Sequence, residues 1–379
     1  MKASEVQNRW STDQLISGIE VPEWVALLQK NKFRVDPTYL HRAAFISAMS
    51  LPVTMAGRLE DATYGRQLAT MDLKPTPLFV LGHWRSGTTH LHNLLGRAPG
   101  HTYSTVLQAV FPTCFLVADK VLPRLMPGAL GETRTYDNVK QGWHEAAEDE
   151  IALAKLTGMS PYISFMFPEN SGKYERYIDF MECSAAEREK WKQQFLYFLK
   201  KIAIQTGNKR IVVKSCAHTA RIRLLLEMFP DAKFVHIHRH PYEVYASTLH
   251  MRSHTDWENF FQLPEGDWEV ERKRQTLLLG QRIFERVIED RSIIPPENFV
   301  EIRYEELCGN EMQHLEKIYT QFKLPNWAEA EKGIRPYVEG LKGYQRNKLK
   351  IGQDEQDEVF HYWRAMFDEY GYDREYAVP

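Results

Sequence analysis

The spacing of apolar residues along the chain changes near Pro75. Upstream, residues 1–74 carry a helical pattern, in which Pro22 and Pro37 each open a helix and Pro52 is expected to kink or split the longer one. Downstream, short apolar runs bounded by turn residues predict strands that are buried on both faces. These runs lie at residues 78–81, 211–213, 234–237 and 299–302.

A helical pattern follows each predicted strand. It is clearest over residues 222–229, where apolar residues recur at the spacing of one helix face before Pro230 ends the helix. Further helices are predicted at residues 274–290, 311–322 and 355–370. Alternating strands and helices predict an α/β fold with a central parallel sheet flanked by helices, in which ligands bind at the C-terminal ends of the strands.

The first predicted strand leads into a loop with the composition of a phosphate-binding site. Residues 82–89 read GHWRSGTT and precede an apolar-periodic helix. Glycines permit a tight turn that exposes successive backbone N–H groups, and a helix N-terminus adds positive potential. The candidate phosphate ligands are Arg85, Ser86, Gly87, Thr88 and Thr89.

The same loop is poorly suited to ATP. A nucleoside-triphosphate loop carries a lysine directly after its second glycine, where this chain has Thr88, and Arg85 supplies the charge from inside the loop instead. The other predicted strands are followed by Lys214, Arg239 and Tyr304, none of which is a magnesium-binding acid. We therefore expect a donor whose leaving phosphate needs no magnesium.

A second motif follows the third predicted strand. Arg239 at the strand end and Ser247, two turns into a helix opened by Pro241, can converge on a phosphate as a bidentate fork and a hydroxyl donor. A surface ion pair is the common alternative for an arginine in this position, so the motif alone is not specific.

Together the two motifs resemble those of the sulfotransferases that use 3′-phosphoadenosine 5′-phosphosulfate (PAPS). The R-S-G-T-T loop looks like that of the Golgi and bacterial branches, and Lys214-Ser215 and the R-Y-E-E-L segment at residues 303–307 extend the match. The resemblance runs from about residue 76 to about residue 350. It implies a P-loop-like three-layer fold.

The resemblance also implies how PAPS is bound. The loop holds the 5′-phosphosulfate, Arg239 and Ser247 grip the 3′-phosphate, and Tyr304 completes the nucleotide site. Arg346 and Lys348 belong to a basic segment in the region where family members close a loop over the nucleotide. A solvated charged surface is the alternative for that segment.

The family moves a sulfuryl group in line from phosphosulfate to a hydroxyl. Negative charge then builds on the bridging oxygen, where a fixed cation and loop N–H groups can stabilise it. Arg85 in the loop and Lys214 after the second predicted strand are our candidates. No metal is expected, because the single charge on the sulfuryl group is within reach of these two cations.

The acceptor hydroxyl also needs a base for its proton. The catalytic glutamate that the Golgi branch carries downstream of the loop arginine is missing here, since residues 103–108 read YSTVLQ. Two alternatives stay open. One is His218, and the other is the acidic cluster at residues 148–150, within which Asp149 and Glu150 are preferred. A structural histidine and carboxylates that favour a helix N-terminus are the non-catalytic interpretations.

Composition bears on partners and location. The 48 Lys and Arg residues balance 50 Asp and Glu, so a formal charge of -2 gives no electrostatic case for binding nucleic acid. The four cysteines form no C-x-x-C pair, and no apolar run is long enough for a secretion signal or a membrane span. We therefore expect a cytoplasmic protein with reduced thiols.

These observations predict an enzyme with a helical N-terminal extension at residues 1–74, packed on an α/β domain at residues 75–379. We expect it to transfer a sulfuryl group from PAPS to a hydroxyl of a small-molecule, lipid or sterol-like, or carbohydrate acceptor. Two alternatives are a P-loop kinase that acts on a small molecule and a nucleotide-binding module that does no chemistry.

Overall fold

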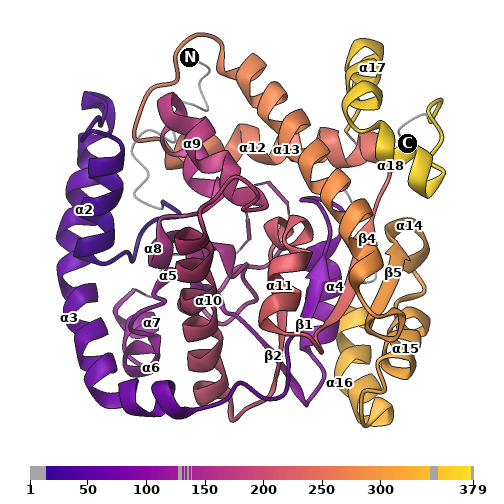
Figure 1. Ribbon diagram of the computed structural model, residues 1–379, viewed down its shortest axis with the longest axis horizontal. Helices are drawn as coiled ribbons and strands as arrows, with labels where there is room; N and C mark the ends of the chain where they lie inside the picture. Colours follow the sequence, from indigo (N-terminus) through magenta and orange to yellow (C-terminus); the bar gives the residue numbers. More distant parts are fainter. Residues whose placement is uncertain are drawn as a thin grey trace. The chain divides into compact units, whose positions relative to one another are not determined.

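The four predicted strands are present and form a single parallel sheet with a fifth strand in the computed structural model of the chain (Figure 1). The strands are β1 (Leu78–Leu81), β2 (His101–Tyr103), β3 (Arg210–Lys214), β4 (Lys233–His238) and β5 (Phe299–Arg303). Their order across the sheet is β2-β3-β1-β4-β5. The predicted α/β fold class is therefore confirmed. The structure describes residues 14–126, 130, 131, 133, 134, 136, 137, 139–341 and 349–376.

The strand register shows which residues lie next to one another at the C-terminal ends of the strands. Val80 of β1 pairs with Lys214 of β3, while His238 at the end of β4 pairs with Arg303 at the end of β5. Every pairing in the sheet is parallel. The C-terminal ends of β1, β3, β4 and β5 therefore meet at one edge, which is where open α/β sheets bind their ligands.

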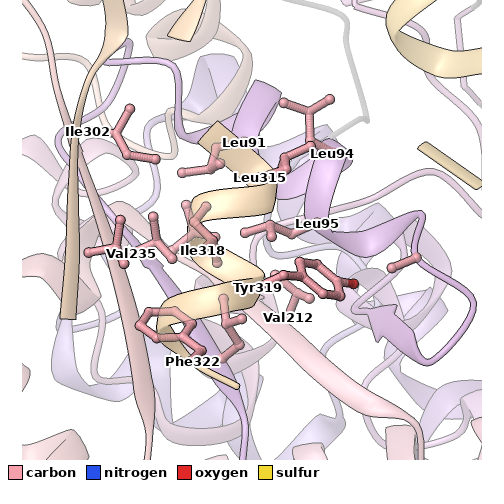
Figure 2. Close-up of a cluster of buried hydrophobic side chains, with 14 of the residues drawn as sticks. Leu91, Leu94, Leu95, Val212, Val235, Ile302, Leu315, Ile318, Tyr319 and Phe322 are labelled. Carbon is pink, nitrogen blue, oxygen red and sulfur yellow. The ribbon is translucent and has the colours of Figure 1, made fainter. Parts of the chain in front are cut away.

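One face of the sheet packs on helices α4 (Thr88–Gly96), α15 (Glu311–Gln321) and α16 (Trp327–Gly340). Alternate residues of a strand point to the same face, and Leu78 and Val80 of β1 both belong to this buried cluster. Figure 2 shows side chains of the cluster that come from α4, α15 and the strands, among them Leu91, Leu94, Leu95, Val212, Val235, Ile302, Leu315 and Ile318. This packing fixes the start of α4 at the end of β1.

The opposite face of the sheet is built around Phe79 of β1. Its ring stacks on Phe234 of β4 at 5.3 Å between centroids, and it also contacts Phe229 and His218. The contacts with Phe229 and His218 place the 3₁₀ helix η6 (Cys216–Ala220) and α11 (Ile222–Met228) over this face. Helices therefore cover both faces, as the apolar strands require.

The described residues divide into two compact units. The sheet unit holds the strands and is formed by Lys74–Tyr103, Asn208–His250 and Glu269–Pro379. The helical unit is formed by Met1–Leu73, Ser104–Gly207 and Met251–Trp268. The division of the chain at residue 74 into an extension and a catalytic domain stays a prediction.

The remaining α-helices fall as follows. The helical unit contains α2 (Val21–Lys30), α3 (Leu40–Thr70), α5 (Val106–Val110), α6 (Phe115–Ala118), α7 (Leu122–Leu125), α8 (Glu150–Thr157), α9 (Ser171–Glu175) and α10 (Ala185–Thr206). Helix α12 spans Pro241–Asn259 and α13 spans Trp268–Asp290. The sheet unit also contains α14 (Tyr304–Leu307), α17 (Gln353–Tyr362) and α18 (Arg364–Tyr370). Within the described ranges, none of the helices combines the length and the apolar character that crossing a bilayer requires.

Of the two outcomes expected at Pro52, a kink or a split, the split is wrong and the kink stays a prediction. Helix α3 runs without interruption through Pro52 from Leu40 to Thr70. A proline frees the carbonyl four residues before it, which here belongs to Ala48. Both Ala48 and Pro52 are exposed, so water can satisfy that carbonyl and the helix continues.

The predicted helix at residues 355–370 is instead two helices, α17 and α18, and Trp363 lies between them. The indole of Trp363 is fully buried, and its Nε1 donates a hydrogen bond to the Leu277 carbonyl at 2.9 Å. It packs directly on Gly280, where any side chain would overlap the ring. The apolar spacing predicts one continuous helix, but the helix breaks at Trp363, where the indole is buried.

Candidate active site

The loop between β1 and α4 has a backbone that requires glycine at two positions. A Cβ atom at Gly82 would lie 2.5 Å from the Ile237 carbonyl oxygen, and one at Gly87 would overlap the ring of Tyr304. Gly87 also has a φ of 99°. Arg85 has a φ of 67°, a left-handed conformation that is uncommon outside glycine and is found at functional sites.

Within the loop, the hydroxyl of Ser86 donates to the His83 carbonyl at 2.7 Å, and the Ser86 N–H approaches the same oxygen at 3.2 Å. Helix α4 begins directly after Gly87, with Thr88 buried and Thr89 half-buried in its first turn. The first N–H groups of a helix have no partner within it, so they can bind an anion. The tight backbone and this helix start together fit a phosphate group.

The second motif lies against this loop. The Nε of Arg85 donates to the Ser247 hydroxyl at 2.9 Å, and the Nη1 of Arg239 donates to the Arg85 carbonyl at 3.3 Å. The guanidinium of Arg239 also lies over the Tyr304 ring, 4.6 Å from its centroid. The structure thus brings together four residues that are assigned to the nucleotide from three separate motifs.

Arg239 has a carboxylate partner that the sequence analysis missed. Its Nε donates to Glu243 Oε2 at 2.7 Å, and its Nη2 contacts the same oxygen. The other oxygen of Glu243 accepts a hydrogen bond from the Tyr376 hydroxyl at 2.7 Å. Glu243 lies four residues after Arg239 in the same segment, a spacing that could have revealed the ion pair. Nothing local in the sequence indicates Tyr376.

The histidines beside these arginines are kept neutral. Burial lowers the pKa of His83 in the loop to about 4, and burial with the neighbouring His236 lowers that of His238 to about 3. Burial also lowers the pKa of His240, which follows Arg239. The positive charge at the end of β4 is therefore carried by the arginine.

The segment that carries His218 is joined to the loop through Thr219, and Lys214 lies just before it in the sheet. Lys214 is buried at the end of β3, and His218 follows in η6 with none of its side chain exposed. The Thr219 hydroxyl accepts from the Gly82 N–H at 2.7 Å and donates to the Gly82 carbonyl at 3.1 Å. These two hydrogen bonds join η6 to the first glycine of the loop.

A model of the sulfotransferase family matches residues 77–329, well over half of the chain. The chain belongs to the sulfotransferase family. This finding confirms the family resemblance inferred from the two motifs. The matched range contains the glycine loop and the residues that surround it.

Relatives of this sulfotransferase are found in mycobacteria. The omega-hydroxy-beta-dihydromenaquinone-9 sulfotransferases of Mycobacterium bovis and Mycobacterium tuberculosis are 29% identical to it over 100% of this chain and 97% of theirs. Among solved structures, sulfotransferase STF9 from Mycobacterium avium matches with a TM-score of 0.66 at 18% identity, covering 97% of this chain and 95% of that chain. Sulfotransferase STF1 from Mycobacterium tuberculosis gives 0.61 at 18% identity, covering 84% and 89% respectively. The structural matches support the fold.

The second candidate for the base of this sulfotransferase lies in the helical unit. Asp149 and Glu150 are both buried at the start of α8, and the neighbouring Glu148 accepts a hydrogen bond from the Tyr162 hydroxyl. The carboxylates and His218 therefore belong to different units. Which of them acts as the base stays a prediction.

Two further expectations concern the nucleotide loop and metals. Arg346 and Lys348 lie outside the described residues. Across the described ranges, no group of three or more His, Cys, Asp or Glu side chains is arranged to hold a metal ion. Independence from metals stays a prediction for this sulfotransferase.

Proposed function

We propose that this sulfotransferase uses PAPS as its sulfuryl donor. The observation that carries the proposal is the set of contacts that joins Arg85, Ser247 and Arg239 beside the glycine loop. PAPS carries a 5′-phosphosulfate and a 3′-phosphate, so it needs two anion sites. The loop with the start of α4 supplies the first, and Arg239 with Ser247 supplies the second.

The reaction then follows from this arrangement. The acceptor hydroxyl oxygen attacks the sulfur, the bond between sulfur and the bridging phosphate oxygen breaks, and adenosine 3′,5′-bisphosphate leaves with the added negative charge. Lys214 and Arg85 are assigned to stabilise that charge. The acceptor proton passes to a base, and the hydrogen bonds between Thr219 and Gly82 favour His218, the adjacent residue, for this role.

We further propose an alcohol on a lipid-like molecule as the acceptor. The support is that the two mycobacterial relatives reported above, which match the whole chain, are named for a hydroxylated menaquinone derivative. A lipid-like alcohol also agrees with the expectation of a hydroxyl acceptor. Carbohydrate alcohols and phenols serve as the comparison substrates.

The test is to incubate the purified protein with radiolabelled PAPS and three classes of acceptor: isoprenoid or other long-chain alcohols, sugars, and phenols. We expect label to pass to the lipid alcohols, with release of adenosine 3′,5′-bisphosphate measured by chromatography. Transfer to sugars alone would contradict the acceptor assignment, and failure to bind the bisphosphate would contradict the donor assignment.

Metal dependence is a separate prediction. EDTA should leave the transfer rate essentially unchanged, because cationic side chains are assigned to the charge that a magnesium ion stabilises in kinases. The rate should be measured before and after chelation, with magnesium added back as the control. Loss of activity that magnesium restores would favour the kinase alternative.

A further inference from the structure

Helix α3 exposes a continuous apolar stripe. At about 100° per residue, an α-helix brings Leu40, Ala44, Ala48, Leu51, Met55, Leu59 and Ala62 within about 60° of Met55. All seven are exposed, and the largest of them are strongly so, with Met55 at 72%, Leu59 at 61% and Leu51 at 60%. The helix is 31 residues long, and its opposite side supplies buried residues such as Ile46, Val53 and Leu68. It is therefore apolar on both sides, which a helix at a water-exposed surface normally is not.

The charges on this stripe have one sign. Arg58 and Arg66 lie within the same sector of the helix and are both exposed. The carboxylates of the helix lie elsewhere, since Glu60 is buried on the opposite side and Asp61 projects sideways. The stripe thus combines exposed apolar side chains with cations and no acid.

A second exposed apolar pair lies at the start and the end of α7, which packs near α3. Leu122 and Met126 pack against the buried cluster that contains Val53 of α3. Val121 and Leu125 are left exposed at 51% and 71%. The adjacent exposed charges, Lys120 and Arg124, are again cationic. The two segments repeat the same combination of apolar and basic side chains.

We propose that the stripe on α3, extended by α7, docks this sulfotransferase on the surface of an anionic lipid bilayer. Apolar side chains inserted at the acyl boundary, with arginine and lysine at the phosphate level, are the chemistry of interfacial helices. A second copy of the chain is a poorer occupant, because the α3 stripes of two copies would bring their arginines together with no acid within the stripe to pair with them. The surface is inferred independently of the donor and the acceptor.

The test is co-sedimentation of the full chain with vesicles of phosphatidylcholine alone and of phosphatidylcholine mixed with phosphatidylglycerol. We expect binding to the mixed vesicles that weakens as salt is raised. The triple variant Leu51→Gln, Met55→Gln, Leu59→Gln should lower the partition coefficient by about tenfold or more, because it removes the inserting side chains. The double variant Arg58→Gln, Arg66→Gln should lower binding to the mixed vesicles by about tenfold and change binding to phosphatidylcholine little.

A matched control uses exposed apolar residues of the sheet unit. Val270→Gln with Ile293→Gln replaces side chains that are 64% and 42% exposed, and it should leave vesicle binding unchanged. Circular dichroism and melting temperature should show that each variant folds. Vesicle binding that is absent, or that the triple variant leaves intact, would overturn the proposal. So would a dimer in sedimentation velocity that the triple variant dissociates, because the stripe would then bind a second copy. The assay contains neither PAPS nor acceptor, so its failure is separate from a failure of the proposed function.

Discussion

Arg239, just before α12, is paired with the Glu243 carboxylate in the first turn of that helix, and both side chains are largely buried. If this arginine holds the 3′-phosphate, Arg239→Ala should lower the affinity for adenosine 3′,5′-bisphosphate by roughly 1.5–3 kcal/mol, the usual value of a charge-assisted contact. Isothermal titration calorimetry with adenosine 3′,5′-bisphosphate measures this loss of affinity. Affinity for AMP, which lacks the 3′-phosphate, should change little.

A matched control for this substitution is Arg364→Ala. Arg364 forms the same type of i,i+4 pair with Asp368, but at an exposed position. Removing this ion pair by Arg364→Ala should not change the affinity for adenosine 3′,5′-bisphosphate. A decrease of only a few tenths of a kcal/mol for Arg239→Ala would instead identify Arg239 as a structural ion-pair residue.

The base is the second question at the scale of single residues. His218→Gln and His218→Ala should lower turnover by about 10²- to 10⁴-fold while bisphosphate affinity stays near that of the wild type, because a general base acts in the transition state. Asp149→Asn and Glu150→Gln are the competing variants and should have mild effects. A selective loss in either of them, with His218 variants nearly active, would assign the base to the carboxylate. Near-normal turnover in all of them would exclude both assignments.

At the scale of elements, the C-terminal segment after α18 controls the arginine site. The Tyr376 hydroxyl donates a hydrogen bond to one carboxylate oxygen of Glu243, and Arg239 donates to the other. A carboxylate at this position repels a 3′-phosphate and competes with it for the guanidinium. Glu243→Gln should therefore raise bisphosphate affinity by about fivefold, equivalent to ~1 kcal/mol. Tyr376→Phe should produce a smaller rise, because the carboxylate keeps its charge but loses its anchor.

Isothermal titration calorimetry with adenosine 3′,5′-bisphosphate should compare these two variants with the control Glu306→Gln. Glu306 lies in the R-Y-E-E-L segment but is exposed, so its removal should be neutral. A fall in affinity for Glu243→Gln would show the opposite role, in which the carboxylate orients Arg239 toward the phosphate.

The elements that carry the site were predictable to different degrees. Strands β1, β3 and β4 are buried on both faces along nearly their whole length. The expectation of two-sided burial is wrong for β5, which reads FVEIR and alternates buried with half-buried residues. Strand β2 is three residues long, reads HTY and has no apolar run. The glycine loop and the arginine–serine spacing were visible because each is a local pattern.

The contacts that complete the site are not local. Thr219 and Gly82 are 137 positions apart, and Tyr376 and Glu243 are 133 apart. Such pairs form only when separate elements are placed by the packing of the core, and a single sequence holds no periodicity that reports them. The sequence therefore supplies the candidate phosphate ligands, whose role stays a prediction, but not the contacts that position them.

At the scale of the whole molecule, stability should depend on pH through a carboxyl group far from the nucleotide residues in the sequence. Glu20, at the start of α2, packs its side chain on Gly57 of α3, where a Cβ atom would overlap its carboxyl oxygen. Burial, with a contribution from the Glu23 carboxylate, raises the pKa of Glu20 from its ordinary value of 4.5 to about 7. The contact between α2 and α3 is therefore made best by the protonated acid.

The direction of the pH effect follows from this shift. Between pH 4.5 and about 7 the folded chain keeps a proton that the unfolded chain releases, so this group makes the free energy of unfolding fall as pH rises through that window. Glu20→Gln removes the ionisation and should make the chain more stable than the wild type at pH 8 but not at pH 5. Urea unfolding followed by circular dichroism at both pH values measures the difference, and the exposed Glu316→Gln serves as the control. An equal effect of Glu20→Gln at the two pH values would show that the side chain contributes through packing alone, and that its protonation is not linked to folding.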